Sequence, residues 1–78
     1  MTPQCKMFLH FLEIHLDSGK KNGDIKASWK SLEYFGLEYR TIKDTINEAI
    51  NAGYVERTVL GKGRTASRFR LIKLPRGV

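Results

Sequence analysis

The apolar pattern of this chain changes its period at Gly53, and this change constrains the fold more than any other feature. Before Gly53, the apolar residues of 42–50 follow the i, i+4, i+7, i+8 spacing of one helical face. After it, residues 54–60 are rich in β-branched and aromatic side chains, and residues 67–71 alternate polar with apolar. The pattern predicts an α+β fold in which helices come first and a β-hairpin closes the chain.

Two helix starts carry cap signals. Thr2 and Pro3 fit an N-cap and a first helical position, and apolar residues at near-helical spacing carry this helix to about Asp17. Ser28 fits the N-cap of a second, short helix. Gly36 follows that helix and suits the left-handed position at which helices stop.

Further elements are predicted around these helices. Residues 24–27 fit one short strand, which follows a polar, glycine-flanked loop at 18–23. A third and longer helix is expected over about 39–52, ended by Gly53. The expected architecture is therefore three helices, a short strand and the C-terminal hairpin.

The hairpin is expected to continue to residue 73, with its turn in a glycine-containing segment at its middle. Alternate side chains of a strand point to opposite faces of the sheet. Phe69 and Leu71 are therefore expected to face inward, and Arg68 and Arg70 outward. The C-terminal part of the chain reads as patterned structure and not as a basic tail.

Length and composition limit the chain to one small domain. We expect a single domain over 1–78 with its core at about 5–74, since roughly 60% of the unfolded surface can be buried at this size. The hydrophobic content of 41% is too high for a disordered chain. No apolar run approaches the roughly 20 residues that span a membrane. A single cysteine and the lack of a signal-peptide pattern favour a cytoplasmic protein.

The formal net charge of +6 is concentrated at one end of the sequence. Residues 1–56 contain seven Lys and Arg and all eight acids, whereas residues 57–78 contain seven Lys and Arg and no acid. This asymmetry indicates contact with a polyanion, with nucleic acid ahead of an anionic membrane surface. The alternative is a solvated hairpin whose charges discourage edge-to-edge strand pairing.

Four short segments follow one another in a distinctive order along the chain. They are Ser28-Trp29-Lys30-Ser31-Leu32, Gly36-Leu37, Arg40-Thr41-Ile42 and Ala52-Gly53-Tyr54-Val55-Glu56. In this order and spacing they resemble the winged helix-turn-helix family, in particular the small bacterial winged-helix proteins carried on phages, plasmids and integrative elements. The resemblance implies a DNA-binding domain whose C-terminal β-hairpin is the wing.

The second helix of a helix-turn-helix lies in the major groove, with its N-terminal residues at base edges. Here those residues are Arg40, Thr41, Lys43, Asp44 and Asn47, on the helix at about 39–52. Arginine can form hydrogen bonds with guanine, asparagine can form them with adenine, and aspartate can accept one from cytosine. Asp44 has an alternative role, because phosphates repel a carboxylate and Asp44 can pair with Arg40 at i,i+4.

The wing, residues 57–73, is expected to supply most of the affinity. Lys62 and Arg64 at its tip suit the minor groove, where negative potential attracts cations, and Gly63 permits a close approach to the backbone. Further candidate DNA contacts lie at the tip, along the solvent face of the hairpin and at the start of the second helix. They are Thr65, Arg57, Arg68, Arg70, Ser28 and Lys30.

No pattern in the chain indicates catalysis, a metal site or a cofactor. The two histidines are five residues apart, and Cys5 has neither metal-ligand nor nucleophile spacing. The segment 61–65 lacks the spacing of a phosphate loop and precedes a strand. Trp29 shares a helical face with Leu32 and is expected in the core.

The main functional hypothesis is sequence-specific binding of double-stranded DNA by a small transcriptional regulator, or by an accessory factor for replication or excision of a mobile element. One such module contacts few base pairs, so a second copy or a larger protein is expected on adjacent half-sites. The alternative is a protein–protein interaction module for a larger regulator or polymerase component, favoured by the mixed charges of the long helix. Structured RNA is a third possible ligand, since it would be bound through the same charges. We expect no enzyme activity, no small-molecule substrate and no membrane partner.

Overall fold

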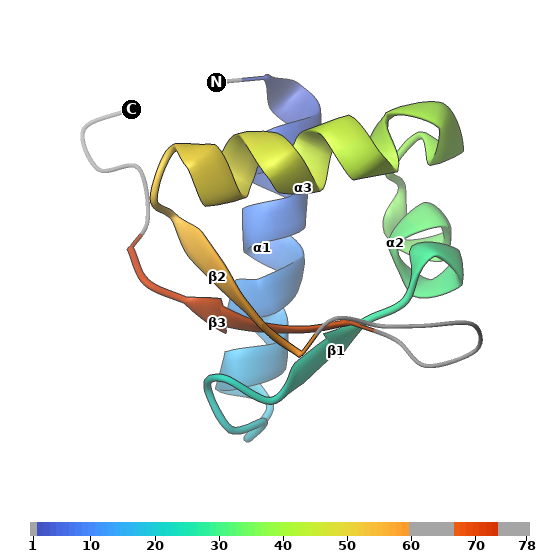
Figure 1. Cartoon of the computed structure of the whole chain (residues 1–78). Coiled ribbons are helices and arrows are strands. Elements are labelled where there is room, and N and C mark those ends of the chain that lie inside the picture. Colours follow the sequence, from blue (N-terminus) through green and yellow to red (C-terminus); the bar gives the residue numbers. More distant parts are fainter. Residues whose placement is uncertain (1, 60–66, 74–78) are drawn as a thin grey trace.

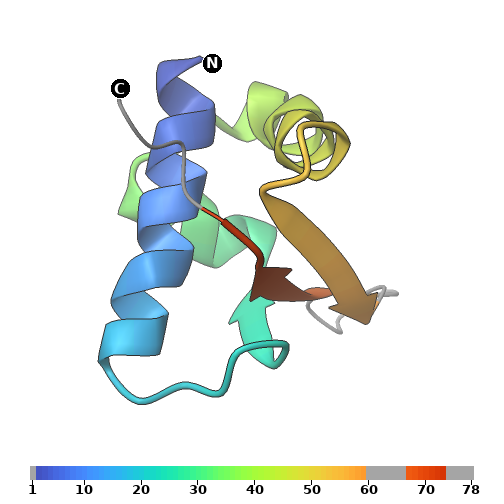
Figure 2. The same ribbon diagram turned by 90° about the vertical axis from the view of Figure 1, so that its left-hand side faces the viewer.

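In the part of the chain that the structure describes, three α-helices and a three-stranded antiparallel sheet are formed, as the α+β pattern predicted. The computed structural model describes residues 2–59 and 67–73. In chain order the elements are α1 (Pro3–Asp17), β1 (Ile25–Ala27), α2 (Trp29–Phe35), the 3₁₀ turn η1 (Tyr39–Thr41), α3 (Ile42–Asn51), β2 (Val55–Val59) and β3 (Ser67–Leu71) (Figure 1). In the view turned by 90°, α1 runs along the left of the molecule, and α3 and β2 lie to its right (Figure 2).

Both predicted helix starts are confirmed by their caps. Thr2 Oγ1 accepts a hydrogen bond from the backbone N–H of Cys5 at 3.2 Å, and Ser28 Oγ accepts one from the N–H of Ser31 at 3.1 Å. Each bond satisfies an N–H group that the first turn of a helix leaves without a partner. The N-terminal boundaries of α1 and α2 are therefore local properties of the sequence.

The predicted stop after α2 is confirmed at Gly36. Its φ of +125° is one that side-chain-bearing residues rarely adopt, and a Cβ at this position would lie only 2.7 Å from Met7 Cε of α1. Glycine thus serves two needs at once, since it permits the turn and lets α1 approach the backbone.

The sheet has the order β1-β3-β2, so the last of the described strands is the central one. On β3, Phe69 lies opposite Ile25 of β1 and Arg57 of β2. An irregularity after Arg57 leaves Thr58 without a partner in the β2–β3 register, and its hydroxyl instead donates to the carbonyl of Gly23 at 2.6 Å. This bond ties β2 to the loop that precedes β1.

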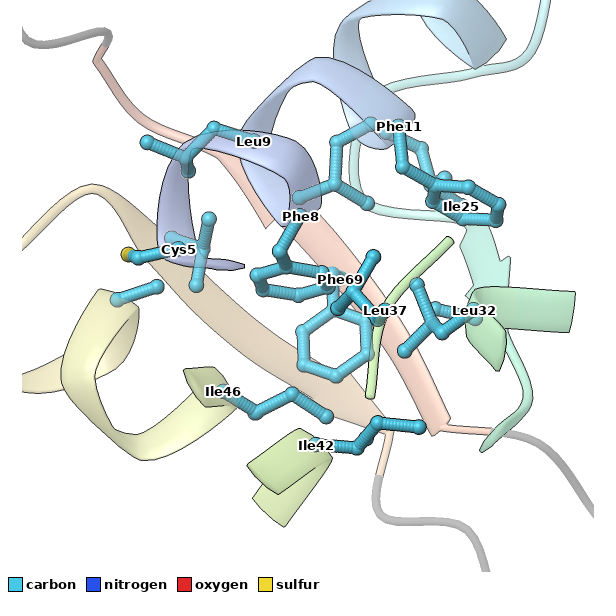
Figure 3. Packing of buried hydrophobic residues seen from close by; sticks show 14 residues of the cluster. Cys5, Phe8, Leu9, Phe11, Ile25, Leu32, Leu37, Ile42, Ile46 and Phe69 are labelled. Atoms are coloured by element: carbon cyan, nitrogen blue, oxygen red, sulfur yellow. The ribbon is translucent and has the colours of Figure 1, made fainter. Parts of the chain in front are cut away.

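The hydrophobic core is organised around Phe69 (Figure 3). Its ring is fully buried and meets the ring of Phe8 on α1 edge to face, with centroids 5.3 Å apart. Leu32 of α2 and Ile42 and Ile46 of α3 belong to the same buried cluster. The predicted alternation along β3 is thus confirmed, since Phe69 faces the core while its two arginine neighbours do not.

The third helix differs from the prediction of one helix over 39–52. The backbone N–H and the hydroxyl of Thr41 both donate to the carbonyl of Glu38, at 3.0 and 3.1 Å, and close a turn with i→i+3 bonding. Because Thr41 uses its hydroxyl in this turn, it does not cap the next helix, and α3 begins at Ile42. The segment is therefore a 3₁₀ turn followed by a shorter α-helix.

Glu48 of α3 holds the start of α1. Its Oε1 accepts a hydrogen bond from the hydroxyl of Thr2 at 2.9 Å, and its Oε2 accepts one from the N–H of Thr2 at 3.2 Å. These bonds lower the pKa of Glu48 below its ordinary value of 4.5. Close by, burial and the charge of Glu48 raise the pKa of the Cys5 thiol to about 11. Cys5 is a buried hydrophobic residue.

We expect Glu48→Gln to destabilise the protein at neutral pH and to matter less in acid. The folded-state pKa of Glu48 is depressed, so its contribution is complete above its ordinary value of 4.5 and is lost as the pH falls through the folded-state pKa. Urea unfolding followed by circular dichroism at several pH values measures this difference. Glu33→Gln, at an exposed position of α2, is the control. Equal losses of unfolding free energy in both variants would contradict the role of the Glu48 hydrogen bonds in joining α1 to α3.

Phe69→Ala is expected to reduce the free energy of unfolding by about 3–5 kcal/mol, because it empties the centre of the core. That loss is comparable with the whole stability of many small domains, so Phe69→Leu is the variant to examine if the alanine protein is unfolded. Ile72→Ala, at a side chain that is 54% exposed, is the control and should change the stability by no more than about 0.5 kcal/mol. A small effect of both Phe69 substitutions in urea unfolding would show that the core is not organised around this ring.

Candidate nucleic-acid interface

The outer face of α3 carries most of the predicted base-contacting side chains. Lys43, Asp44 and Asn47 are exposed, because the apolar face of the helix is turned into the core. Arg40 is also exposed, three residues before Lys43 in η1. We call these four residues, Arg40, Lys43, Asp44 and Asn47, the α3 surface. Their spacing places them on one solvent-facing side of the segment.

Thr41 was predicted to contact bases, but in the structure its side chain has a structural role. It is half-buried, and its hydroxyl donates to the carbonyl of Glu38. The side chain therefore closes the turn between α2 and α3 and is not presented with the α3 surface. A threonine just before a helix is a common N-cap residue, but here the Thr41 hydroxyl is already bonded within the 3₁₀ turn.

The i,i+4 ion pair between Arg40 and Asp44 is not formed in the described structure. Arg40 lies in η1 and Asp44 in α3, so the two residues do not belong to one continuous α-helix. Asp44 instead lies in the first turn of α3, a helix without a side-chain cap. Negative charge there stabilises the free N–H groups of the helix end.

Two exposed aromatic side chains lie at the entrance to α3. Trp29, the first residue of α2, is 42% exposed and Tyr39 of η1 is 56% exposed. Their rings meet edge to face with centroids 5.6 Å apart. The prediction that Trp29 belongs to the core is wrong, because among the residues of the short helix α2 only Leu32 is fully buried. No sequence signal joined Trp29 with Tyr39, since the turn between α2 and α3 brings them together.

The arginines of the wing are divided between the two faces of the sheet. Arg57 lies opposite Phe69 in the register, and its guanidinium is 5.7 Å from the centre of the Phe69 ring. Arg68 and Arg70 alternate with Phe69 along β3 and point to the other face. The prediction that all three line one solvent face is therefore wrong, because strand register decides the face.

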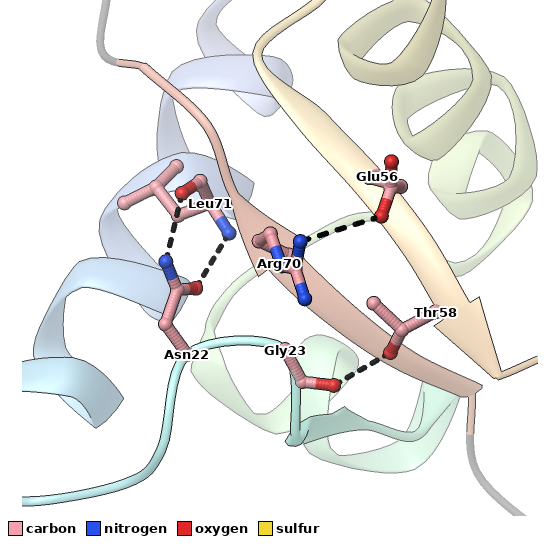
Figure 4. Close-up of polar contacts among 6 residues, drawn as sticks. All are labelled: Asn22, Gly23, Glu56, Thr58, Arg70 and Leu71. Carbon is pink, nitrogen blue, oxygen red and sulfur yellow. Dashed lines mark hydrogen bonds and ion pairs between the residues drawn. The ribbon is translucent and has the colours of Figure 1, made fainter.

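Two acids accompany the outward arginines. Arg68 forms an ion pair with Asp24, and the guanidinium of Arg70 lies 3.9 Å from the carboxylate of Glu56 (Figure 4). Both acids precede the basic segment in the sequence and meet the arginines only in the folded sheet. The described strands of the wing are therefore less positive than the charge count along the chain predicted. The predicted tip contacts Lys62, Gly63, Arg64 and Thr65 lie outside the described residues.

Of the two DNA contacts predicted at the start of α2, Ser28 and Lys30, only one has a side chain without a partner in the described structure. The hydroxyl of Ser28 is used in the helix cap, where it accepts a hydrogen bond from the N–H of Ser31 and donates one to Ser31 Oγ at 2.8 Å. Lys30 is exposed and makes no ion pair within the described ranges. Lys30 therefore remains available for a phosphate, whereas Ser28 has a structural role.

An apolar hollow of about 420 Å³ lies beside α2, between Phe11 of α1 and the side chains of Tyr34 and Phe35. Tyr34 is 95% exposed, so its ring contributes almost nothing to the core. The short helix α2 turns this ring to solvent. This hollow is distinct from the α3 surface, none of whose residues lines it.

Neither a membrane span nor a metal site is found among the described residues. No helix in residues 2–59 and 67–73 has the length and apolar character needed to cross a bilayer. The same residues contain no group of three or more His, Cys, Asp or Glu arranged to hold a metal ion. Comparison with protein-family models, curated proteins and solved structures finds no match to the chain. The function must therefore be inferred from the surfaces themselves.

Asp44→Asn is expected to lower the free energy of unfolding by about 0.3–1 kcal/mol, because it removes a favourable charge from the first turn of α3. Asp17→Asn is the matched control, since Asp17 is the last residue of α1, where a negative charge is unfavourable. Thermal and urea unfolding should show a loss for the first variant and none for the second. Equal losses would contradict the helix-end role of Asp44.

Proposed function

We propose that the chain is a winged helix-turn-helix protein that binds double-stranded DNA with α3 in the major groove. The element order α1-β1-α2-α3-β2-β3 supports this, since two helices joined by a short turn are followed directly by a hairpin. The sheet order β1-β3-β2 supports it as well, because the hairpin pairs with the short strand that separates α1 from α2.

The α3 surface is the observation that carries the proposal. The helix α3 buries its apolar face and presents Lys43 and Asn47 to solvent, with Arg40 of η1 just before it, and its ten residues span about 15 Å. Arginine and asparagine are the side chains that read guanine and adenine through paired hydrogen bonds in the major groove. A helix of this length, with its readers near the N-terminal end, matches the way recognition helices enter the groove.

Neighbouring side chains extend this surface. Trp29 and Tyr39 provide apolar rings beside the start of α3, suited to thymine methyl groups or deoxyribose. Arg57 lies on the face of the sheet that packs against the helices, and Lys30 lies next to Trp29. These two cations are the phosphate contacts that we propose within the described residues.

The resemblance to small winged-helix proteins of mobile elements supports a role as a transcriptional regulator or as an accessory factor in replication or excision. One α3 surface covers few base pairs, so specific binding calls for a second copy or a larger protein on an adjacent half-site. Selection of duplexes from random sequence, followed by footprinting, would define the target and its half-site spacing.

Binding to a selected duplex is expected to quench the fluorescence of Trp29, the only tryptophan in the chain. Arg40→Gln should weaken specific binding by about 1–3 kcal/mol, the size of one paired base contact. Lys6→Gln removes the same charge from an exposed position on α1, outside the α3 surface, and should leave specificity unchanged. Fluorescence and anisotropy titrations measure both effects, and equal weakening by the two substitutions would refute base reading by Arg40.

Affinity for random duplex DNA is expected to fall steeply with salt. About four to six neutralised phosphates would give a slope of about −4 to −5 in a plot of log K against log salt concentration. Anisotropy titrations at several salt concentrations measure this slope. Lack of any salt-dependent duplex binding by the full chain would rule out the proposed function.

The apolar hollow beside α2 favours a second candidate function, contact with another protein. A fully exposed tyrosine next to two phenylalanines is the kind of aromatic group found at the centre of protein interfaces. Tyr34→Ser would abolish such a complex and leave duplex binding intact, while Arg40→Gln would do the reverse. Comparison of the two variants in co-purification and duplex titrations therefore separates the two functions.

A further inference from the structure

A second cationic surface lies on the side of the sheet that faces away from Phe69. On β1, the exposed Lys26 lies directly opposite Arg68 of β3 in the register. Lys20 and Lys21, in the loop between α1 and β1, join these two side chains around a hollow of about 490 Å³. We call this hollow the basic hollow, and its described cations are Lys20, Lys21, Lys26 and Arg68.

The loop that carries two of these lysines is fixed to the sheet (Figure 4). The side-chain amide of Asn22 donates to the carbonyl of Leu71 at 3.1 Å and accepts from its N–H at 2.9 Å, so it imitates a strand neighbour of β3. The next residue, Gly23, accepts a hydrogen bond from Thr58 of β2. The lysines are therefore held beside the sheet before any ligand arrives, which reduces the ordering that binding requires.

The charges of the basic hollow are unbalanced. The one described carboxylate in its wall, Asp24, is already paired with Arg68. Within residues 2–59 and 67–73, no ion pair joins Lys20, Lys21 or Lys26 to an acid. Three ammonium groups around one concave surface repel one another, and a bound anion would relieve this repulsion.

The basic hollow is separate from the α3 surface. Its remaining described wall comes from His15 in the last turn of α1 and Ser31 of α2, and no described residue of α3 or β2 lines it. Ser31 contributes a hydroxyl, and neutral histidine an N–H group, so the wall holds hydrogen-bond donors as well as positive charge. A ligand here would not occupy the groove-reading helix.

We propose that the basic hollow is a binding site for phosphate groups that acts independently of the α3 surface. Lysine binds phosphate as a point charge, and three lysines converging on one concavity suit a group with more than one negative charge. The volume lies within the range of small-ligand sites, about 300–1,000 Å³. The phosphate belongs either to a free phosphate compound or to the backbone of a second DNA duplex.

Two titrations of the ¹⁵N-labelled full chain test this proposal and identify the source of the phosphate. The first uses inorganic pyrophosphate, and the second uses a short duplex with the variant Arg40→Gln/Asn47→Ala, in which the α3 surface is disabled. In each, the amide signals of residues 18–27 and of Arg68 are followed. Lys20→Gln/Lys26→Gln should weaken binding at least tenfold and Lys26→Gln alone at least threefold, whereas Lys6→Gln, which removes one charge from an exposed position outside the hollow, should change it less than twofold.

Every outcome of these titrations has a definite meaning. Shifts with pyrophosphate alone support a site for a free phosphate compound, and shifts with the duplex support a second contact with DNA. Absence of shifts in this segment with both probes overturns the proposal, as does equal weakening by Lys26→Gln and Lys6→Gln. Because the second titration uses a disabled α3 surface, failure of the proposed DNA-reading function leaves this result unaffected.

Discussion

The fold depends on the burial of one aromatic ring on the central strand. Phe69 meets Phe8 of α1 edge to face and shares its buried cluster with Ile42 and Ile46 of α3. Phe69 is among the largest fully buried side chains, so the orientation of β3 follows from the need to enclose this ring. Because β3 pairs with both other strands, that orientation also sets the faces on which the side chains of β1 and β2 lie.

The same constraint divides the charge of the wing. With Phe69 turned inward, Arg57 is left on the helix side of the sheet, and Arg68 and Arg70 on the outer side near Asp24 and Glu56. The wing is thus not a uniform positive surface. Its inner side adjoins the proposed DNA-reading helix, while its outer side contributes Arg68 to the basic hollow. Affinity for a polyanion is therefore better assigned to particular faces than to the hairpin as a whole.

Much of the fold could be predicted from local patterns, and the failures lie where elements meet. The caps at Thr2 and Ser28 and the stop at Gly36 were predictable because each depends on a few neighbouring residues. The start of α3 was not predictable, because the hydroxyl of Thr41 could either cap α3 or bond within the preceding turn. In the structure it donates to the carbonyl of Glu38 in that turn. Exposure of Trp29 was missed for a related reason, since helical spacing shows which residues share a face but not how much of that face is covered.

The sequence by itself determined the order of helices and strands, the ends of α1 and α2 and the identity of Phe69 as a core residue. These follow from side-chain periodicity and from hydrogen bonds between near neighbours. Only the tertiary structure decided which acids meet which arginines, that Trp29 and Tyr39 touch, and that two loop lysines stand beside Lys26 and Arg68. Those contacts join residues far apart in the chain, and strand register and loop anchoring set them, so no count along the sequence could have revealed them.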